Sequence, residues 1–156
     1  MTQSILGTAT ALAILLAAPV AAETLRATTT FNTSIQQKAE VQPADGMAVT
    51  YPVTYAGGLE GCTAAVAESL YPKDGGDWGI YEVAADVTCP DGGFAFTSTG
   101  AWDAKGFHGT GSVTEGSGTG SYASLAGRLA QSGSLAPAAN DSMDLSYELM
   151  IDRRAP

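Results

Sequence analysis

The stretch Met143-Asp144-Leu145-Ser146-Tyr147-Glu148-Leu149-Met150-Ile151 decides the fold class. Every odd-numbered residue in it is large and apolar, whereas Asp144, Ser146 and Glu148 alternate with them. Successive side chains of a β-strand point to opposite faces, so this period of two predicts a strand with one buried and one solvated face.

The same alternation recurs through most of the chain, and no window shows the apolar spacing of a long amphipathic helix. Stretches rich in Gly, Pro and Asp separate the strand-like runs, as is typical of hairpin turns. The runs are residues 24–35, 47–55, 62–71, 79–89, 93–102, 106–114, 122–135 and 143–151. They predict an all-β fold: a single antiparallel eight-stranded barrel with meander connections, because closure removes exposed sheet edges.

The first 22 residues differ from the rest. An apolar run from Ile5 ends in Val20-Ala21-Ala22, with small residues at the positions that a signal peptidase reads. We therefore expect residues 1–22 to be a signal peptide and residues 23–156 to be a β-barrel domain that is periplasmic or secreted. Because no Lys or Arg precedes the run, an uncleaved anchor is the alternative. We expect no membrane span in the mature chain.

Charge and cysteine content narrow the function classes. Sixteen acidic and seven basic residues give a net charge of −9, which disfavours nucleic acid as a partner. The only cysteines, Cys62 and Cys89, lie in the part expected to be exported, where pairing is more common than metal ligation or thiol chemistry. A disulfide between them is predicted.

Candidate ligand-binding residues are aromatic. Phe96 and Trp102 fall on one face of a predicted strand, with the small Ser98 and Gly100 between them. Most such aromatics fill a core, but the small residues could leave a pocket here. Tyr81 and Tyr147, on other strands, would then offer hydroxyl groups to orient a ligand.

His108 is the only histidine, so a two-histidine acid–base scheme or a histidine-rich metal site is excluded. A structural or surface role is the more common outcome for such a residue, and a place in the pocket is the alternative. Glu82 and Asp86 lie on the face opposite Tyr81, where solvation is more plausible than paired catalysis. No metal site and no organic cofactor are predicted.

The segment Gly118-Thr119-Gly120-Ser121-Tyr122-Ala123-Ser124-Leu125-Ala126-Gly127 resembles a motif of the allene oxide cyclase and dirigent-like barrel superfamily. Independently of that resemblance, Gly118 and Gly120 would allow positive φ at a bend, Tyr122 would anchor a strand, and Gly127 would admit a neighbouring backbone. The resemblance implies an eight-stranded barrel, a hydrophobic ligand cavity and a homotrimer. No second motif carries over the family's catalytic residues.

Three hypotheses for function follow. The first is an exported barrel that binds a small hydrophobic molecule without a catalytic group. The second is an isomerase or cyclase that needs a carboxylate or His108 inside the cavity. The third is a non-enzymatic structural or interaction protein of the cell envelope, with a solidly packed interior.

Overall fold

The computed structural model describes residues 23–153, so the signal peptide expected at residues 1–22 lies outside the described residues. Most of this part of the chain is β-structure, with two short 3₁₀ turns. In order, the elements are β1 (Thr24–Asn32), η1 (Thr33–Ile35), β2 (Gln37–Lys38), β3 (Met47–Thr54), β4 (Ala56–Gly57), β5 (Thr63–Lys73), η2 (Asp74–Gly76), β6 (Trp78–Cys89), β7 (Gly92–Asp103), β8 (Gly106–Val113), β9 (Thr119–Gly120), β10 (Gly127–Pro137) and β11 (Met143–Arg153).

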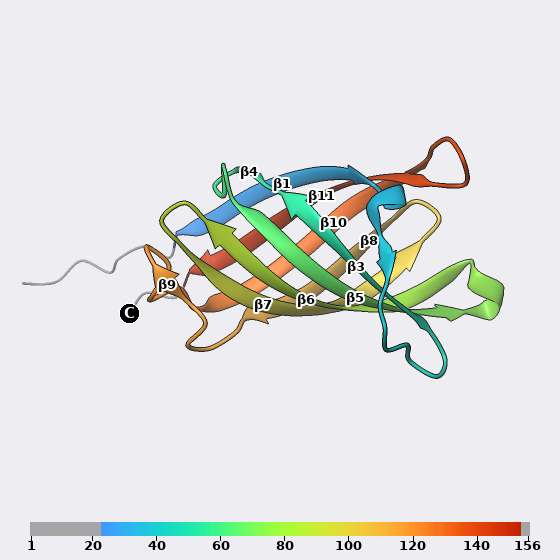
Figure 1. Ribbon diagram of the computed structural model, residues 1–156, viewed down its shortest axis with the longest axis horizontal. Helices are drawn as coiled ribbons and strands as arrows, with labels where there is room; N and C mark the ends of the chain where they lie inside the picture. The colour runs from blue at the N-terminus through green and yellow to red at the C-terminus, as the bar shows by residue number, and fades with distance from the viewer. Residues whose placement is uncertain (1–22, 154–156) are drawn as a thin grey trace, which may run out of the picture.

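The strands form one antiparallel sheet that curls into a barrel-like shape (Figure 1). Their order is β2-β3-β5-β6-β7-β8-β10-β11-β1-β4, and β9 pairs with β7. From β3 to β11, long strands that follow one another in the chain are neighbours in the sheet, and β1 pairs with β11 over its full length. Each of the eight sequence runs corresponds to one long strand, which confirms the all-β prediction.

The two ends of this strand order are connected through the chain, because β3, next to one end, leads directly into β4 at the other end. β4 follows β3 after Tyr55 alone, and β4 pairs with β1 through Ala27 opposite Gly57. The Thr29 hydroxyl, on β1, also donates a 2.7 Å hydrogen bond to the carbonyl of Thr54, at the end of β3. Contacts of β1 therefore reach both sides of the bend at Tyr55.

Two strand boundaries differ from the sequence expectation by three residues or more, and the others by at most two. The first strand ends at Asn32, because the Asn32 side chain accepts a 2.9 Å hydrogen bond from the Ser34 amide and so caps the η1 turn. The strand expected from Tyr122 begins only at Gly127. Tyr122 lies instead in a turn, where its amide donates to the Thr119 carbonyl at 3.0 Å.

The glycine motif has a different geometry from the one expected. Gly120 does adopt a positive φ of 55°, but Gly118 does not, and Gly116 does so instead, at 71°. A Cβ on Gly118 would collide with the carbonyl oxygen of Tyr122, so close backbone approach explains that glycine. Half-buried Tyr122 packs its ring 5.4 Å from that of Phe94, which ties the turn to the sheet interior.

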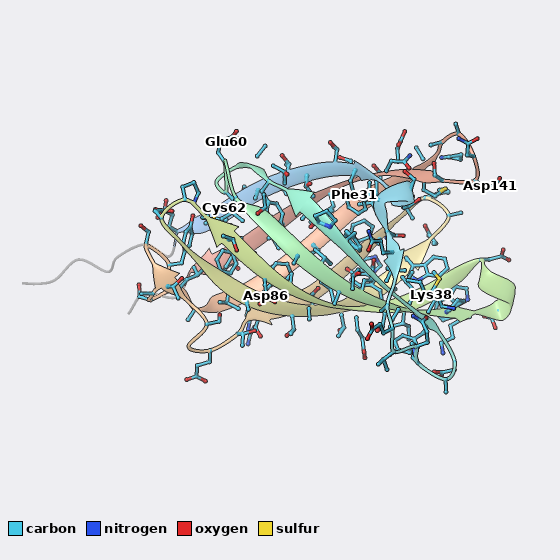
Figure 2. All side chains as sticks on the ribbon, viewed as in Figure 1. Phe31, Lys38, Glu60, Cys62, Asp86 and Asp141 are labelled. Carbon is cyan, nitrogen blue, oxygen red and sulfur yellow. A yellow bond between two sulfur atoms is a disulfide. The ribbon has the colours of Figure 1, made fainter. Side chains whose placement is uncertain are left out.

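One end of the curled sheet has a densely packed interior. Cys62 and Cys89 form the predicted disulfide there, just beyond the paired ends of β5 and β6 (Figure 2). Tyr55 and Leu59, whose backbones are hydrogen-bonded to that of Cys62, are almost completely buried. This part of the interior is therefore filled and cross-linked.

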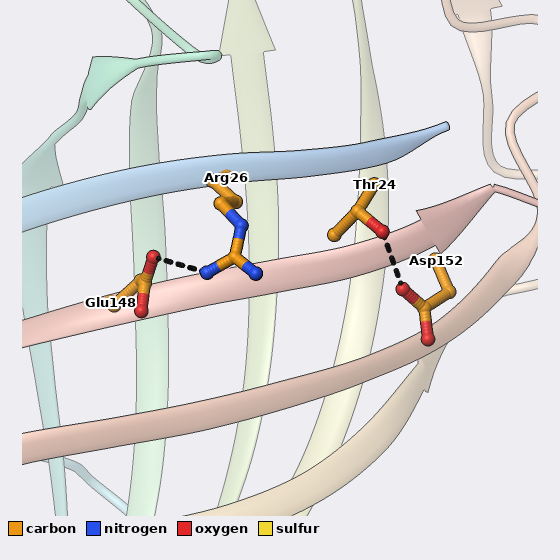
Figure 3. Close-up of polar contacts among 4 residues, drawn as sticks. All are labelled: Thr24, Arg26, Glu148 and Asp152. Atoms are coloured by element: carbon orange, nitrogen blue, oxygen red, sulfur yellow. Dashed lines mark hydrogen bonds and ion pairs between the residues drawn. The ribbon is translucent and has the colours of Figure 1, made fainter. Parts of the chain in front are cut away.

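The outer surface is polar and links the first strand to the last. The Arg26 guanidinium pairs with the Glu148 carboxylate at 3.1 Å, and the Thr24 hydroxyl donates to Asp152 at 3.0 Å (Figure 3). Exposed pairs of this kind contribute only about 0–1 kcal/mol, so they support the pairing of β1 with β11 without dominating it. Within residues 23–153, no helix has the length and apolarity needed to cross a membrane.

Candidate functional site: an interior cavity with one carboxyl group

A cavity of about 170 Å³ lies inside the curled sheet, toward the end where η1 lies. In Figure 1 this is the right-hand end, opposite the chain termini. Its walls are mainly apolar and aromatic, and its polar groups are few. The lining residues are Thr33, Gln36, Tyr51, Val66, Glu68, Leu70, Tyr81, Val83, Phe96, Trp102, Phe107, Gln131, Leu135, Leu145 and Tyr147.

Strand alternation places Glu68 in this wall. From Cys62, the residue before β5, the side chains of Cys62, Ala64 and Val66 are buried at every second position, and Glu68 is the next residue in that series. Its neighbours Ala65 and Ala67 face outward and are exposed. The period of two therefore carries a carboxyl group into an otherwise apolar interior.

The surroundings of Glu68 change its acidity. Burial raises the pKa of the Glu68 carboxyl from 4.5 to about 7, and a hydrogen bond from Tyr51 partly opposes that rise. The Tyr51 hydroxyl donates to Glu68 Oε2 at 2.9 Å. No Lys, Arg or His within residues 23–153 lines the cavity, so no cation there compensates the carboxylate. Glu68 thus changes its charge near neutral pH.

Phenol groups from three other strands surround this carboxyl. Burial, followed by the negative charge of Glu68, raises the pKa of Tyr81 on β6. Burial likewise raises the pKa of Tyr147 on β11, and its hydroxyl lies 3.1 Å from that of Tyr55. These phenols stay neutral at physiological pH and act as hydrogen-bonding groups.

Two hydrogen-bond donors, the Tyr81 phenol Oη and the Trp102 indole Nε1, are buried without a hydrogen-bond partner in residues 23–153. Each ring lies over a glycine of a neighbouring strand. A Cβ on Gly79 would lie 2.6 Å from the Trp102 ring, and one on Gly100 would lie 2.6 Å from the Tyr81 ring. Glycine is therefore required beneath these rings, and it fixes where they form the wall.

Aromatic rings form a continuous row along one side of the interior. Tyr81 and Phe107 meet edge to face with centroids 5.7 Å apart, and Phe107 and Tyr147 follow at 5.8 Å. Each pair belongs to different strands, so the row depends on the register of the whole sheet. Edge-to-face pairs hold their partners in defined orientations, which gives the cavity a stiff wall.

Beside this row, a polar pair lies at the centre of the sheet. The Ser98 hydroxyl donates a 2.6 Å hydrogen bond to Gln131 Oε1, and both residues are buried. Ser98 therefore lies where the sequence placed it, facing inward between Phe96 and Trp102, but its hydroxyl is already occupied by Gln131.

Four of the five candidate ligand-binding residues, Tyr81, Phe96, Trp102 and Tyr147, line the cavity. The fifth, His108, is exposed on the outer face of β8, opposite Ala101 of β7, and does not line the cavity. Glu82 and Asp86 are also exposed on the outer face, as expected (Figure 2 labels Asp86).

The sequence did not single out eleven of the fifteen lining residues, and the polar ones among them that lie on strands are Tyr51, Glu68 and Gln131. Each lies on the inward parity of its strand, so the alternation of its apolar neighbours was a usable signal. A polar residue on an apolar face is an informative exception, because burying it is costly unless it is hydrogen-bonded.

The geometry limits what the site can hold. The cavity is smaller than the roughly 300–1,000 Å³ of pockets for drug-sized molecules. Apolar cavities of about 150 Å³ do accept a benzene-sized molecule. No group of three or more His, Cys, Asp or Glu side chains within the described residues is arranged to hold a metal ion. The site can therefore enclose one ring or a short aliphatic chain and offer it a single carboxyl.

The surface around this end of the sheet is unusually apolar. Exposed large apolar side chains are Ile35 in η1, Val41 in the loop before β3, Met47 at the start of β3, and Trp78 and Ile80 at the start of β6. All five come from segments at the end where the cavity lies (Figure 1). Apolar molecules that approach the cavity from this end would meet a favourable surface.

Comparison with known proteins gives a family. The model of the family described as "Protein of unknown function (DUF3224)" matches residues 27–148, which includes every residue that lines the cavity. No curated protein matches the chain.

Proposed function

The chain belongs to the DUF3224 family, and we propose that it binds a small, mainly apolar molecule in the interior cavity. The observation that carries this proposal is the cavity of about 170 Å³ among Val83, Phe96, Phe107 and Tyr147. Protein interiors are normally close-packed, so an apolar space of this size bordered by stiff rings favours a bound molecule over a purely structural interior.

The size and lining define the ligand class. The ligand carries one ring or a comparable aliphatic body, with one polar group directed to Glu68. Anionic molecules such as fatty acids or phosphates are disfavoured, because Glu68 and the net charge of −9 repel them. Larger ligands would need to extend past η1 into solvent.

Titration with toluene, followed by amide chemical shifts, tests this proposal. We expect shifts to concentrate on strands that line the cavity and the melting temperature to rise with toluene concentration. Val83→Phe, which fills the cavity, should weaken binding. Ala84→Phe, at the adjacent exposed position of β6, should leave it unchanged. Shifts scattered over the outer surface, or equal binding by Val83→Phe, would contradict a cavity site.

We also propose that the curled sheet closes into an eight-stranded barrel made of the long strands. The support is the continuity of β3 with β4, which pairs with β1, together with the hydrogen bond from Thr29 to Thr54. The same strand arrangement supports the proposed relation to the allene oxide cyclase and dirigent-like superfamily. Slow hydrogen exchange of amides along both edges of β1 would be expected of a closed barrel; fast exchange along the edge facing β3 would refute closure.

A second candidate function is an isomerase or cyclase, and one observation favours it. Glu68 is a carboxyl inside the cavity whose pKa of about 7 suits proton transfer at neutral pH. Binding without turnover is the leading proposal, because the only other acid–base groups of residues 23–153 that line the cavity are phenols with raised pKa values. Turnover of an unsaturated epoxide that Glu68→Gln abolishes would favour the enzyme.

Export and self-association are further proposals. The disulfide supports a periplasmic or secreted location, since such bonds persist in oxidising compartments. An N-terminus at Glu23 in protein isolated from that compartment would establish cleavage; an intact Met1 would refute it. A trimer is proposed from the family resemblance, and the exposed Trp78 and Ile80 offer it an apolar contact. Sedimentation as a monomer would exclude it.

A further inference from the structure

We propose that the molecule bound in the cavity is a small organic amine in its cationic form, with its ammonium group against Glu68. This inference rests on the proposed ligand-binding function and specifies its chemistry. It follows from an imbalance of charge inside the cavity, from the aromatic character of its walls, and from its size.

The charge imbalance is the first step. Glu68 is the only Asp or Glu that lines the cavity, and its one hydrogen-bond partner in the described chain is the Tyr51 hydroxyl. Desolvated carboxylates are normally paired with a cation, because an unpaired charge in an apolar site is costly. The basic side chain of Arg26 is paired elsewhere, with Glu148 on the outer surface. A ligand cation would supply what the protein itself lacks.

The groups that face Glu68 do not compete for this role. They are Tyr51 from β3, Tyr81 from β6 and Tyr147 from β11, with Tyr55 behind Tyr147. All are phenols, and burial suppresses their ionisation. A phenol carries no positive charge, so none of them neutralises the carboxylate. A hydroxyl can accept a hydrogen bond from an ammonium group, so these phenols are compatible with a cation beside Glu68.

The aromatic walls favour the same ligand class. Tyr81, Phe107 and Tyr147 are arranged edge to face, so their ring planes present both faces and edges to the interior. The face of an aromatic ring attracts cations, and this attraction strengthens when water is excluded. A carboxylate combined with several rings is a recognisable site for an amine with an apolar body. The net charge of −9 also draws cations toward the protein.

Three probes of nearly equal shape separate this inference from the broader proposal: benzylamine, benzyl alcohol and toluene. Calorimetric titration of the mature protein at low ionic strength would measure all three between pH 5.5 and about 8.5 (a window chosen around the Glu68 pKa of about 7). At the upper end we expect benzylamine to bind at least about tenfold more tightly than benzyl alcohol. Its affinity should fall by about tenfold per pH unit below pH 7, as Glu68 takes up a proton.

The Glu68→Gln variant should bind benzylamine no more tightly than benzyl alcohol, and its affinity for benzylamine should not depend on pH. The same variant should still bind toluene. Glu82→Gln is the matched control, since it changes the net charge equally but lies on the exposed face of β6. The pH profile of the wild-type protein needs no variant, so the test holds even if Glu68→Gln folds poorly.

The possible failures are distinguishable. If toluene and benzyl alcohol bind as tightly as benzylamine at every pH, the amine inference is wrong and the apolar-ligand proposal stands. If none of the three probes binds, both are wrong. If Glu82→Gln abolishes the preference as fully as Glu68→Gln does, the preference arises from net charge and the inference is again wrong.

Discussion

Replacing Glu68 by Gln should stabilise the protein at alkaline pH and leave it nearly unchanged at acidic pH. Gln has almost the shape of Glu, and its amide oxygen can still accept the hydrogen bond from Tyr51. The substitution therefore removes one ionisation and little else. Its effect on stability reports directly on the desolvation of the Glu68 carboxyl.

The sign and size of the effect follow from proton linkage. The pKa of Glu68 is about 7 in the folded protein and near its ordinary value of 4.5 in the unfolded chain. Between these pH values the native state binds more protons, so the unfolding free energy of the wild type falls as pH rises. A difference of about 2.5 pH units corresponds to about 3 kcal/mol at full ionisation, which we reduce to about 2 kcal/mol because Glu68 is only partly buried.

Urea unfolding of both proteins from about pH 4 to about pH 8.5 measures the difference, with Glu82→Gln as a surface control. We expect the two curves of stability against pH to coincide near the acidic limit and to separate through about pH 7. Glu82→Gln should follow the wild type. A constant offset between Glu68→Gln and the wild type, or a less stable variant at alkaline pH, would refute the claim that the carboxyl is desolvated and uncompensated.

The remaining predictions concern the frame of the cavity. The double substitution Cys62→Ser with Cys89→Ser should lower the unfolding free energy by about 3–4 kcal/mol, because the disulfide closes a loop between residues 27 positions apart. Denaturant unfolding measures this loss, and a change below about 1 kcal/mol would contradict it. Gly100→Ala places a methyl group against the backbone carbonyl oxygen of His108 and 2.6 Å from the Tyr81 ring, and should destabilise by about 1–3 kcal/mol. Thr99→Ala, facing outward, should stay within about 0.5 kcal/mol. Equal effects would show that the neighbouring strand and the ring both shift to admit the methyl group.

The sequence was sufficient to predict the strands because they depend on local pattern, and the disulfide because the chain has only two cysteines, both in the part expected to be exported. Alternation of large apolar and polar residues, as from Met143 to Ile151, locates strands and their inward faces. The two strand boundaries that differ most are those where a polar or glycine residue reorganises the backbone: Asn32 caps a turn, and Gly120 bends the chain before β10.

The cavity was only partly predictable. Tyr81, Phe96, Trp102 and Tyr147 could be placed on inward faces, but the space between them depends on which glycines lie beneath the rings, and that depends on long-range register. His108 lies in a Gly-rich strand without a clear apolar alternation, so the sequence did not indicate that the His108 side chain points outward. Glu68 continues the inward-facing series of Cys62, Ala64 and Val66, so its position predicted an inward side chain even though a charged residue is normally expected outside.

A crystal structure of the mature protein soaked in iodobenzene tests the central claim most directly. Iodobenzene is close to the size that the cavity of about 170 Å³ admits, and anomalous scattering locates its iodine without ambiguity. The account predicts an anomalous peak inside the sheet, within contact distance of Val66, Phe96 or Tyr147. An interior filled by collapsed side chains, with iodine found only on the outer surface, would contradict it.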